Sequence, residues 1–191
     1  MKKFLMVFFL LLALLACGKN EDVKNVNIKK PDSKSQDLIV PETQKLAFNE
    51  FNFDTIEING ERIKSQDFYA SSKINAVLIW ATYCDECKIM LVNLNNLKGV
   101  YDKKDLQISS LILDTSMDTS TNLDEAKKII KDNSLSFTNL IPNPTTEDSL
   151  STVEKIPLFI LLDSKGKVIS AYEGNLSKEV LEKIINNALG K

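Results

Sequence analysis

Two cysteines with two acidic residues between them are the part of this sequence best suited to chemistry. They are Cys84 and Cys87, and Asp85 and Glu86 separate them. Two thiols at this spacing can exchange a dithiol for a disulfide within one turn of backbone. The pair therefore predicts thiol–disulfide redox chemistry.

The cysteines lie between a predicted strand and a predicted helix. Residues 76–80 form an apolar run that favours β-structure, which indicates a buried strand. Apolar residues then recur at intervals of three and four, which predicts a helix with one apolar face. These residues are Cys87, Met90, Leu91, Leu94 and Leu97. A helix start stabilises a nearby thiolate, so we expect the reactive Cys84 there and Cys87 one turn inside.

The two acids between the cysteines are candidates for tuning the reduction potential. Asp85 and Glu86 are expected to destabilise a thiolate at Cys84, which makes the disulfide harder to reduce and favours a reductant. The alternative is that both side chains point to water and merely favour the first turn of the helix.

Composition restricts the class of protein. The chain has 191 residues, 43% of them hydrophobic and 26% charged, which fits one domain of roughly 100–150 residues. The formal net charge is -2 with acids and bases interspersed, so we expect no nucleic acid partner. The sequence contains 0 histidines, which excludes a histidine-based triad and every histidine-containing metal site.

The first residues have the features of a targeting signal. Two lysines precede an apolar run at positions 4–16, which predicts a signal peptide at 1–16. The run is shorter than the roughly 20 residues of a membrane span. Its end resembles a bacterial lipobox, which implies that Cys17 is lipidated and becomes the mature N-terminus; an ordinary cleaved signal peptide is the alternative. We therefore expect a lipid-anchored protein of the bacterial envelope that faces the periplasm or the exterior.

The rest of the chain divides into a tether and one domain. Residues 17–46 are polar and contain prolines, so they are predicted to form a flexible tether. The folded domain is predicted over 47–191. With Cys17 assigned to lipid, Cys84 and Cys87 remain and can pair with each other, because disulfides persist outside the cytosol.

The domain alternates short strands and helices. Alternating apolar residues from 51 to 58, followed by Asn59-Gly60, predict a hairpin. The other predicted elements are a helical turn at 66–70, a strand at 106–113, a helix from 121 to about 133, a strand at 136–141, an irregular proline-containing loop, strands at 158–162 and 167–172, and a terminal helix capped by Ser177. This order predicts an α/β fold with a mixed central sheet and helices on both faces.

Several motifs in this order resemble the TlpA/ResA branch of the thioredoxin superfamily, over about residues 48–189. They are Trp80-Ala81-Thr82-x-Cys84-x-x-Cys87, Lys155-Ile156-Pro157 before a strand, Asp163-x-x-Gly166 in a turn, and Gly174 beyond it. The resemblance implies a thioredoxin-like fold with an N-terminal β-hairpin and a central insertion. It also implies a thiol-disulfide oxidoreductase, most simply a reductase.

The resemblance assigns roles to individual residues. Cys84 would attack a target disulfide and Cys87 would resolve the mixed disulfide. Trp80 would pack beside the pair and shield it. Pro157 would be a cis-proline facing the cysteines, and the backbone of Ile156 would pair with the substrate.

The implied partners follow from the same resemblance. They are proteins with thiols or disulfides, such as apocytochrome c cysteines or misoxidised envelope proteins, and a membrane thiol carrier that delivers electrons. No nucleotide or flavin motif is present, so the redox-active disulfide itself is the expected redox group, without a metal or other cofactor. We expect a monomer.

Three positions depart from the family pattern. Leu78 stands where thioredoxins have an acid, Met90 where ResA-like proteins often have a glutamate, and Val92 where a proline is common. Deprotonation of Cys87 therefore lacks its usual buried base.

Other functions remain open on the sequence alone. A zinc site needs about four ligands, and the chain has no second cysteine pair. A purely structural disulfide across two residues would stabilise little. A thioredoxin-fold peroxidase and a non-catalytic binding lipoprotein with an inert disulfide are the remaining alternatives; a copper chaperone of similar fold would use a histidine.

Overall fold

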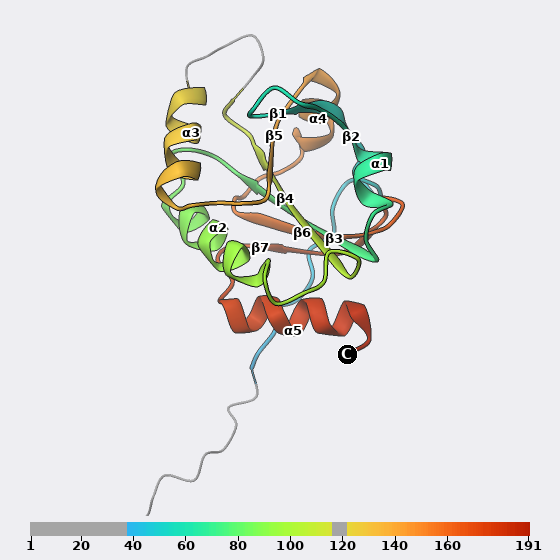
Figure 1. The fold of residues 1–191 in the computed structure, drawn as a ribbon. Helices are drawn as coiled ribbons and strands as arrows, with labels where there is room; N and C mark the ends of the chain where they lie inside the picture. Colours follow the sequence, from blue (N-terminus) through green and yellow to red (C-terminus); the bar gives the residue numbers. More distant parts are fainter. Residues whose placement is uncertain (1–37, 116–121) are drawn as a thin grey trace, which may run out of the picture. The chain divides into compact units, whose positions relative to one another are not determined.

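The computed structural model describes residues 38–115 and 122–191 (Figure 1). Their strands form one mixed sheet in the order β2-β1-β5-β4-β3-β6-β7. The strands are β1 (Asp54–Glu57), β2 (Arg62–Lys64), β3 (Ile74–Trp80), β4 (Leu106–Ile112), β5 (Thr138–Ile141), β6 (Leu158–Asp163) and β7 (Val168–Glu173). The helices are α1 (Ser65–Tyr69), α2 (Asp85–Leu97), α3 (Leu123–Asp132), α4 (Pro144–Leu150) and α5 (Lys178–Leu189). The predicted α/β fold with a mixed central sheet is confirmed.

β3 lies at the centre of the sheet and leads to the cysteines. It pairs in parallel with β4 and antiparallel with β6, and all seven of its residues are buried. Leu78 and Trp80 belong to the core on one face of the sheet, whereas Val77 and Ile79 belong to the core on the other. A strand covered on both faces explains an unbroken apolar run.

The helices cover both faces of the sheet, as the order of elements predicted (Figure 1). The core on one face contains residues of α2, α3 and α5, and α2 contacts α5. The core on the other face contains Phe68 and Tyr69 of α1 and Leu150 of α4. The predicted apolar face of α2 is confirmed, because Met90, Leu94 and its other members are fully buried.

One predicted loop is a helix. The prediction of an irregular segment after residue 141 is wrong, because Pro144–Leu150 form α4. Proline breaks a helix in its interior but suits its first position, where no N–H donor is needed. Asn143 and Thr146 cap this end reciprocally: the Thr146 N–H donates to Asn143 Oδ1 over 3.0 Å, and the Asn143 N–H donates to Thr146 Oγ1 over 2.7 Å.

The N-terminal hairpin is shorter than its sequence pattern. β1 begins at Asp54, so Phe51 and Phe53 precede it rather than form its first residues. Both rings are buried, at 0% and 4% exposure, and Tyr69 donates a hydrogen bond from its hydroxyl to the carbonyl of Phe51 over 2.9 Å. The apolar spacing of Phe51 and Phe53 therefore results from burial against α1 and not from strand pairing.

The last part of the predicted tether contacts the domain. The Gln44 N–H donates to the carbonyl of Ala171 in β7 over 2.7 Å, and Lys183 of α5 donates to the carbonyl of Leu38 over 2.7 Å. Val40 packs against the core that contains α5. The predicted signal peptide at 1–16, the lipidated Cys17 and the tether up to residue 37 lie outside the described residues.

Candidate active site

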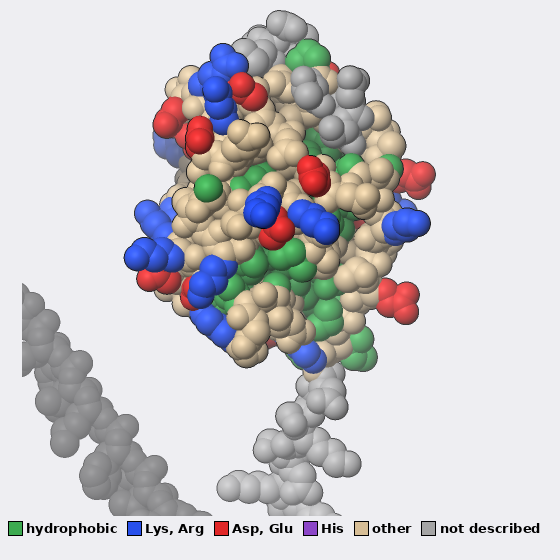
Figure 2. Space-filling view, turned by 90° about the vertical axis from the view of Figure 1, so that its right-hand side faces the viewer, with side chains coloured by type: hydrophobic (Ala, Val, Ile, Leu, Met, Phe, Trp, Pro, Cys, Tyr) green, Lys and Arg blue, Asp and Glu red, His purple; other side chains and the backbone are tan. Residues whose placement is uncertain are grey.

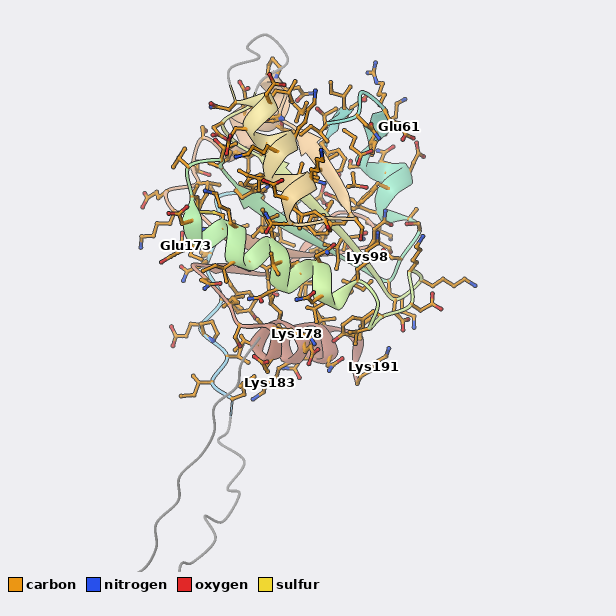
Figure 3. The ribbon with its side chains drawn as sticks, turned by 60° about the vertical axis from the view of Figure 1, so that its left-hand side comes forward. Glu61, Lys98, Glu173, Lys178, Lys183 and Lys191 are labelled. Carbon is orange, nitrogen blue, oxygen red and sulfur yellow. A yellow bond between two sulfur atoms is a disulfide. The ribbon has the colours of Figure 1, made fainter. Side chains whose placement is uncertain are left out.

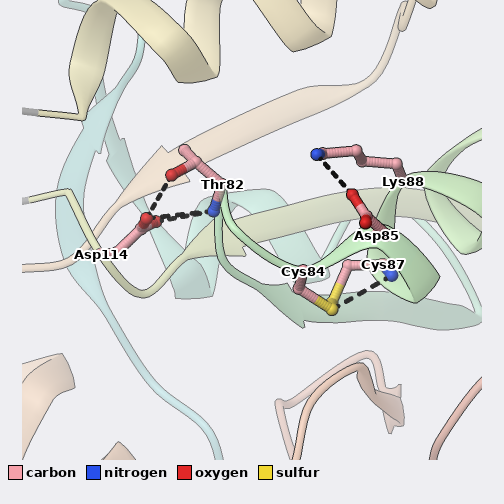
Figure 4. The surroundings of a disulfide bond; sticks show 6 residues. All are labelled: Thr82, Cys84, Asp85, Cys87, Lys88 and Asp114. Atoms are coloured by element: carbon pink, nitrogen blue, oxygen red, sulfur yellow. Dashed lines mark hydrogen bonds and ion pairs between the residues drawn. A yellow bond between two sulfur atoms is a disulfide. The ribbon is translucent and has the colours of Figure 1, made fainter.

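The two cysteines form a disulfide at the start of α2 (Figure 4). Cys84 is the N-cap residue, and its sulfur accepts the Cys87 N–H over 3.2 Å. Cys84 is partly exposed, whereas Cys87 is fully buried. Because an attacking sulfur needs access to its target, this geometry suits Cys84 for the attack on a substrate and Cys87 for resolution from within the core.

Asp114 fixes the turn that leads into Cys84 (Figure 4). It follows β4, which lies beside β3. Its carboxylate accepts the backbone N–H of Thr82 over 3.0 and 3.1 Å and also the Thr82 hydroxyl. The side chain of Asn122 donates to the backbone carbonyl of Asp114 over 2.8 Å. Asp114 is therefore a positioning residue for the active-site turn, which the sequence analysis did not identify.

Replacing Asp114 with alanine is expected to destabilise the protein by about 1–3 kcal/mol, because the N–H and hydroxyl of the buried Thr82 lose a charged acceptor. Guanidinium chloride unfolding followed by circular dichroism measures the change. Asp132→Ala, at an exposed position of α3, is the matched control and should change stability by less than about 0.5 kcal/mol. Equal effects of the two variants would contradict the assignment.

Lys88 offsets one of the two acids between the cysteines. Its Nζ lies 2.8 Å from Oδ1 of Asp85, and the hydrogen bond from Lys88 lowers the pKa of the Asp85 carboxyl below its usual value. Glu86 is exposed and makes no ion pair within the described residues. The local charge is therefore less negative than the sequence Cys-Asp-Glu-Cys suggests, and the tuning role of Asp85 and Glu86 stays a prediction.

Trp80 supports the site from inside the core. Its side chain is fully buried, and the indole N–H donates to Ser110 Oγ over 3.0 Å. Ser110 donates in turn to Asn139 Oδ1 over 2.8 Å, so this polar chain connects β3, β4 and β5. Because the ring is fully buried, it supports the site from within the core. That it shields the cysteines stays a prediction.

The loop before β6 lies at the same edge of the sheet as the cysteines. β3 pairs with β6 up to Ile79 opposite Leu158, so the next positions in this register are Trp80 and Pro157. The Ile156–Pro157 peptide bond is cis, the conformation that the resemblance implies. Ile156 is partly buried and, like Cys84, packs against the core that contains α2.

One exposed side chain next to the cysteines is an additional candidate for substrate contact. Tyr83 immediately precedes Cys84 and is 75% exposed. Large exposed hydrophobic side chains beside a reactive group favour contact with another molecule. The position of Tyr83 inside the cysteine motif was the signal that could have identified it.

The surroundings of Cys87 are apolar. Leu78 and Met90, which replace the acids of the family pattern, are fully buried in the same core as Cys87. No Asp, Glu or Lys side chain is buried among the described residues. The absence of a buried base, noted from the sequence, therefore holds for this part of the chain.

The described residues offer neither a metal site nor a membrane span. No cluster of three or more histidine, cysteine, aspartate or glutamate residues in that part of the chain could hold a metal ion. No described helix is both long and apolar enough to cross a membrane.

Comparison with known proteins relates both the sequence and the fold to thioredoxin-like proteins. The chain is 27% identical over 134 residues to the thiol-disulfide oxidoreductase ResA of Bacillus thuringiensis subsp. konkukian, which covers 70% of this chain and 73% of the relative. A ResA of Bacillus cereus is 27% identical over 131 residues, or 69% of this chain and 71% of the relative. No family model matches the chain.

Solved structures share the fold. A thiol:disulfide interchange protein of the thioredoxin family from Chlorobium tepidum superimposes with a TM-score of 0.63 at 16% identity, over 78% of this chain and 100% of that one. StoA from Bacillus subtilis gives a TM-score of 0.56 at 19% identity, over 69% and 94% of the two chains.

The sheet, the helices and the disulfide at the start of α2 define a protein with a thioredoxin-like fold. The similarity to ResA proteins confirms the resemblance to the TlpA/ResA branch that the sequence motifs indicated.

Proposed function

We propose that the protein is an envelope thiol-disulfide oxidoreductase that reduces protein disulfides through Cys84 and Cys87. The observation that carries the proposal is the disulfide between a partly exposed cysteine at a helix start and a buried cysteine one turn inside. The ResA relatives, which are named thiol-disulfide oxidoreductases, support the same activity.

The reaction proceeds in two exchange steps. In the reduced protein, the Cys84 thiolate attacks one sulfur of a substrate disulfide; a mixed disulfide forms and the other substrate sulfur leaves as a thiolate. Cys87 then loses its proton and attacks Cys84, which regenerates the Cys84–Cys87 disulfide and releases the second substrate sulfur. Two electrons pass to the substrate. A second thiol protein must then reduce the Cys84–Cys87 disulfide.

Reduction of insulin tests the proposal directly. The purified protein, supplied with dithiothreitol, should accelerate the precipitation of insulin chains, whereas consumption of hydrogen peroxide by the reduced protein should stay at the uncatalysed rate. Peroxide consumption without insulin reduction would favour the peroxidase alternative. If the protein shows neither activity, a binding protein with an inert disulfide would be favoured.

The location and partners form part of the proposal. The lipobox-like sequence at Cys17 supports lipid anchoring in the bacterial envelope, and the polar residues after it support a tether. A membrane thiol carrier would then be the electron donor, and the protein would act as a monomer. Labelling with radioactive palmitate in cells should require Cys17, and a Cys17→Ser protein that still incorporates the label would contradict the anchor.

Charges beside Cys84 are expected to change the reduction potential in opposite directions. Glu86→Gln removes a negative charge that destabilises the thiolate, so it should raise the potential by about 10–30 mV. Lys88→Gln removes the positive charge that offsets Asp85, so it should lower the potential by a similar amount. Equilibration with glutathione measures both. Shifts of the same sign would indicate an effect on helix stability instead of charge.

A further inference from the structure

A cavity of about 410 Å³ opens at the end of the sheet away from the cysteines. β3 pairs with β4 along all of Leu106–Ile112, but β5 pairs with β4 only at Ser109–Leu111. Residues 136–137, just before the paired Thr138, therefore make no ladder pairs with residues 106–108, and an open wedge lies there. Because β3 spans about 20 Å from end to end, the wedge is remote from Cys84.

The wedge combines an apolar floor with cationic walls. Leu106, Ile108 and Phe137 line it and are nearly buried, at 5%, 6% and 6% exposure. Its charged lining consists of three lysines and no acid: Lys98, Lys103 and Lys104. A volume of this size, apolar with a few polar groups, is typical of small-molecule sites. On the face shown in Figure 2, hydrophobic side chains lie among charged side chains of both signs.

The three lysines of the wedge differ in their hydrogen bonds and ion pairs. Lys98, at the end of α2 (Figure 3), donates to the carbonyl and the hydroxyl of Ser136 and so is held at the wall. Lys103 and Lys104 are exposed and make no ion pair within the described residues. Other lysines of this region are paired: Lys73 and Lys191 both bind Asp105 at 2.7 Å. Two lysines that make no ion pair within the described residues therefore stand beside an apolar cavity, although Asp102 and Asp105 flank them in the sequence.

We propose that this wedge binds a small organic anion, in which an apolar body enters between β4 and residues 136–138 and a carboxylate or phosphate group meets Lys103 and Lys104. The wedge closes where β4 and β5 pair, so the ligand enters from the open end. The site is separate from the thiol chemistry and does not depend on the proposed function.

Titration of the isotope-labelled full-length protein with benzoate, phenylphosphate and neutral benzamide tests the site by NMR. We expect saturable shifts of the amides of residues 106–108 and 136–138 with an anion, with dissociation constants of about 1 mM. Tighter binding of phenylphosphate than of benzoate would identify a phosphate site, and the reverse order a carboxylate site. Equal shifts with benzamide, or no saturation by either anion below about 10 mM, would overturn the proposal.

Two double variants distinguish the effect of lysines at the wedge on anion binding from the effect of lysines elsewhere. Lys103→Gln with Lys104→Gln should weaken anion binding about tenfold, since each exposed charge contributes modestly. Lys127→Gln with Lys128→Gln, at exposed positions of α3, should leave binding unchanged. Insulin reduction should be the same in both variants. Equal binding by the two variants would show that the lysines of the wedge do not hold the ligand.

Discussion

A Cys87→Ser protein is expected to remain covalently attached to its substrates and to lose turnover by at least about 10³-fold. Cys84 can still attack a substrate disulfide from its partly exposed position at the start of α2. The mixed disulfide then persists, because the buried sulfur that would attack Cys84 has been replaced by a hydroxyl. Non-reducing gels of cell extracts, followed by mass spectrometry of the trapped species, would identify the substrate.

Cys84→Ser is the matched control for this experiment. It should also abolish turnover, but it should trap no partner, since Cys87 is fully buried and cannot reach a substrate disulfide. Trapping by Cys84→Ser and not by Cys87→Ser would reverse the roles of the two cysteines. Trapping by neither variant, together with inactive wild-type protein, would favour the binding protein with an inert disulfide.

The parts of the fold that depend on residues close together in the sequence could be predicted. The apolar run of β3 and the three- and four-residue spacing of α2 both result from burial, and burial of these residues is observed. The order of the strands could not be predicted, because β5 pairs with β1 and β4 through contacts between distant segments. The sequence analysis predicts a proline-containing loop where α4 lies, because proline marks a loop as readily as the first residue of a helix.

The same distinction applies to the site. The cysteines are three residues apart, and this spacing, together with the lack of histidine and the assignment of Cys17 to lipid, indicated a redox couple. Lys88 lies three residues after Asp85, and helical spacing could have identified that ion pair. Asp114 is 32 residues from Thr82. Its role required the knowledge that β3 and β4 are adjacent and parallel, so that the residues after each strand meet at one edge.

Replacement of Trp80 is expected to have the largest effect on stability among the residues of the site. Trp80→Ala should lower the free energy of unfolding by about 3–5 kcal/mol, because the ring is fully buried at the end of the central strand. Trp80→Phe keeps most of the ring but removes the indole N–H donor and leaves the buried Ser110 hydroxyl without it. The Trp80→Phe variant should lower the free energy of unfolding by about 1–3 kcal/mol.

The hydrogen-bond contribution of Trp80 can be separated from its packing by a double-mutant cycle with Ser110→Ala. If the hydrogen bond contributes to stability, Ser110→Ala should lower the free energy of unfolding by about 1 kcal/mol less in the Trp80→Phe background than in the wild-type protein. Circular dichroism should follow the unfolding of the oxidised proteins, because Trp80 is the single tryptophan and its fluorescence is lost. Tyr83→Ala, which removes a 75% exposed aromatic ring from the adjacent turn, should cost less than about 0.5 kcal/mol. Additive effects of the Trp80 and Ser110 changes would attribute the role of Trp80 to packing alone.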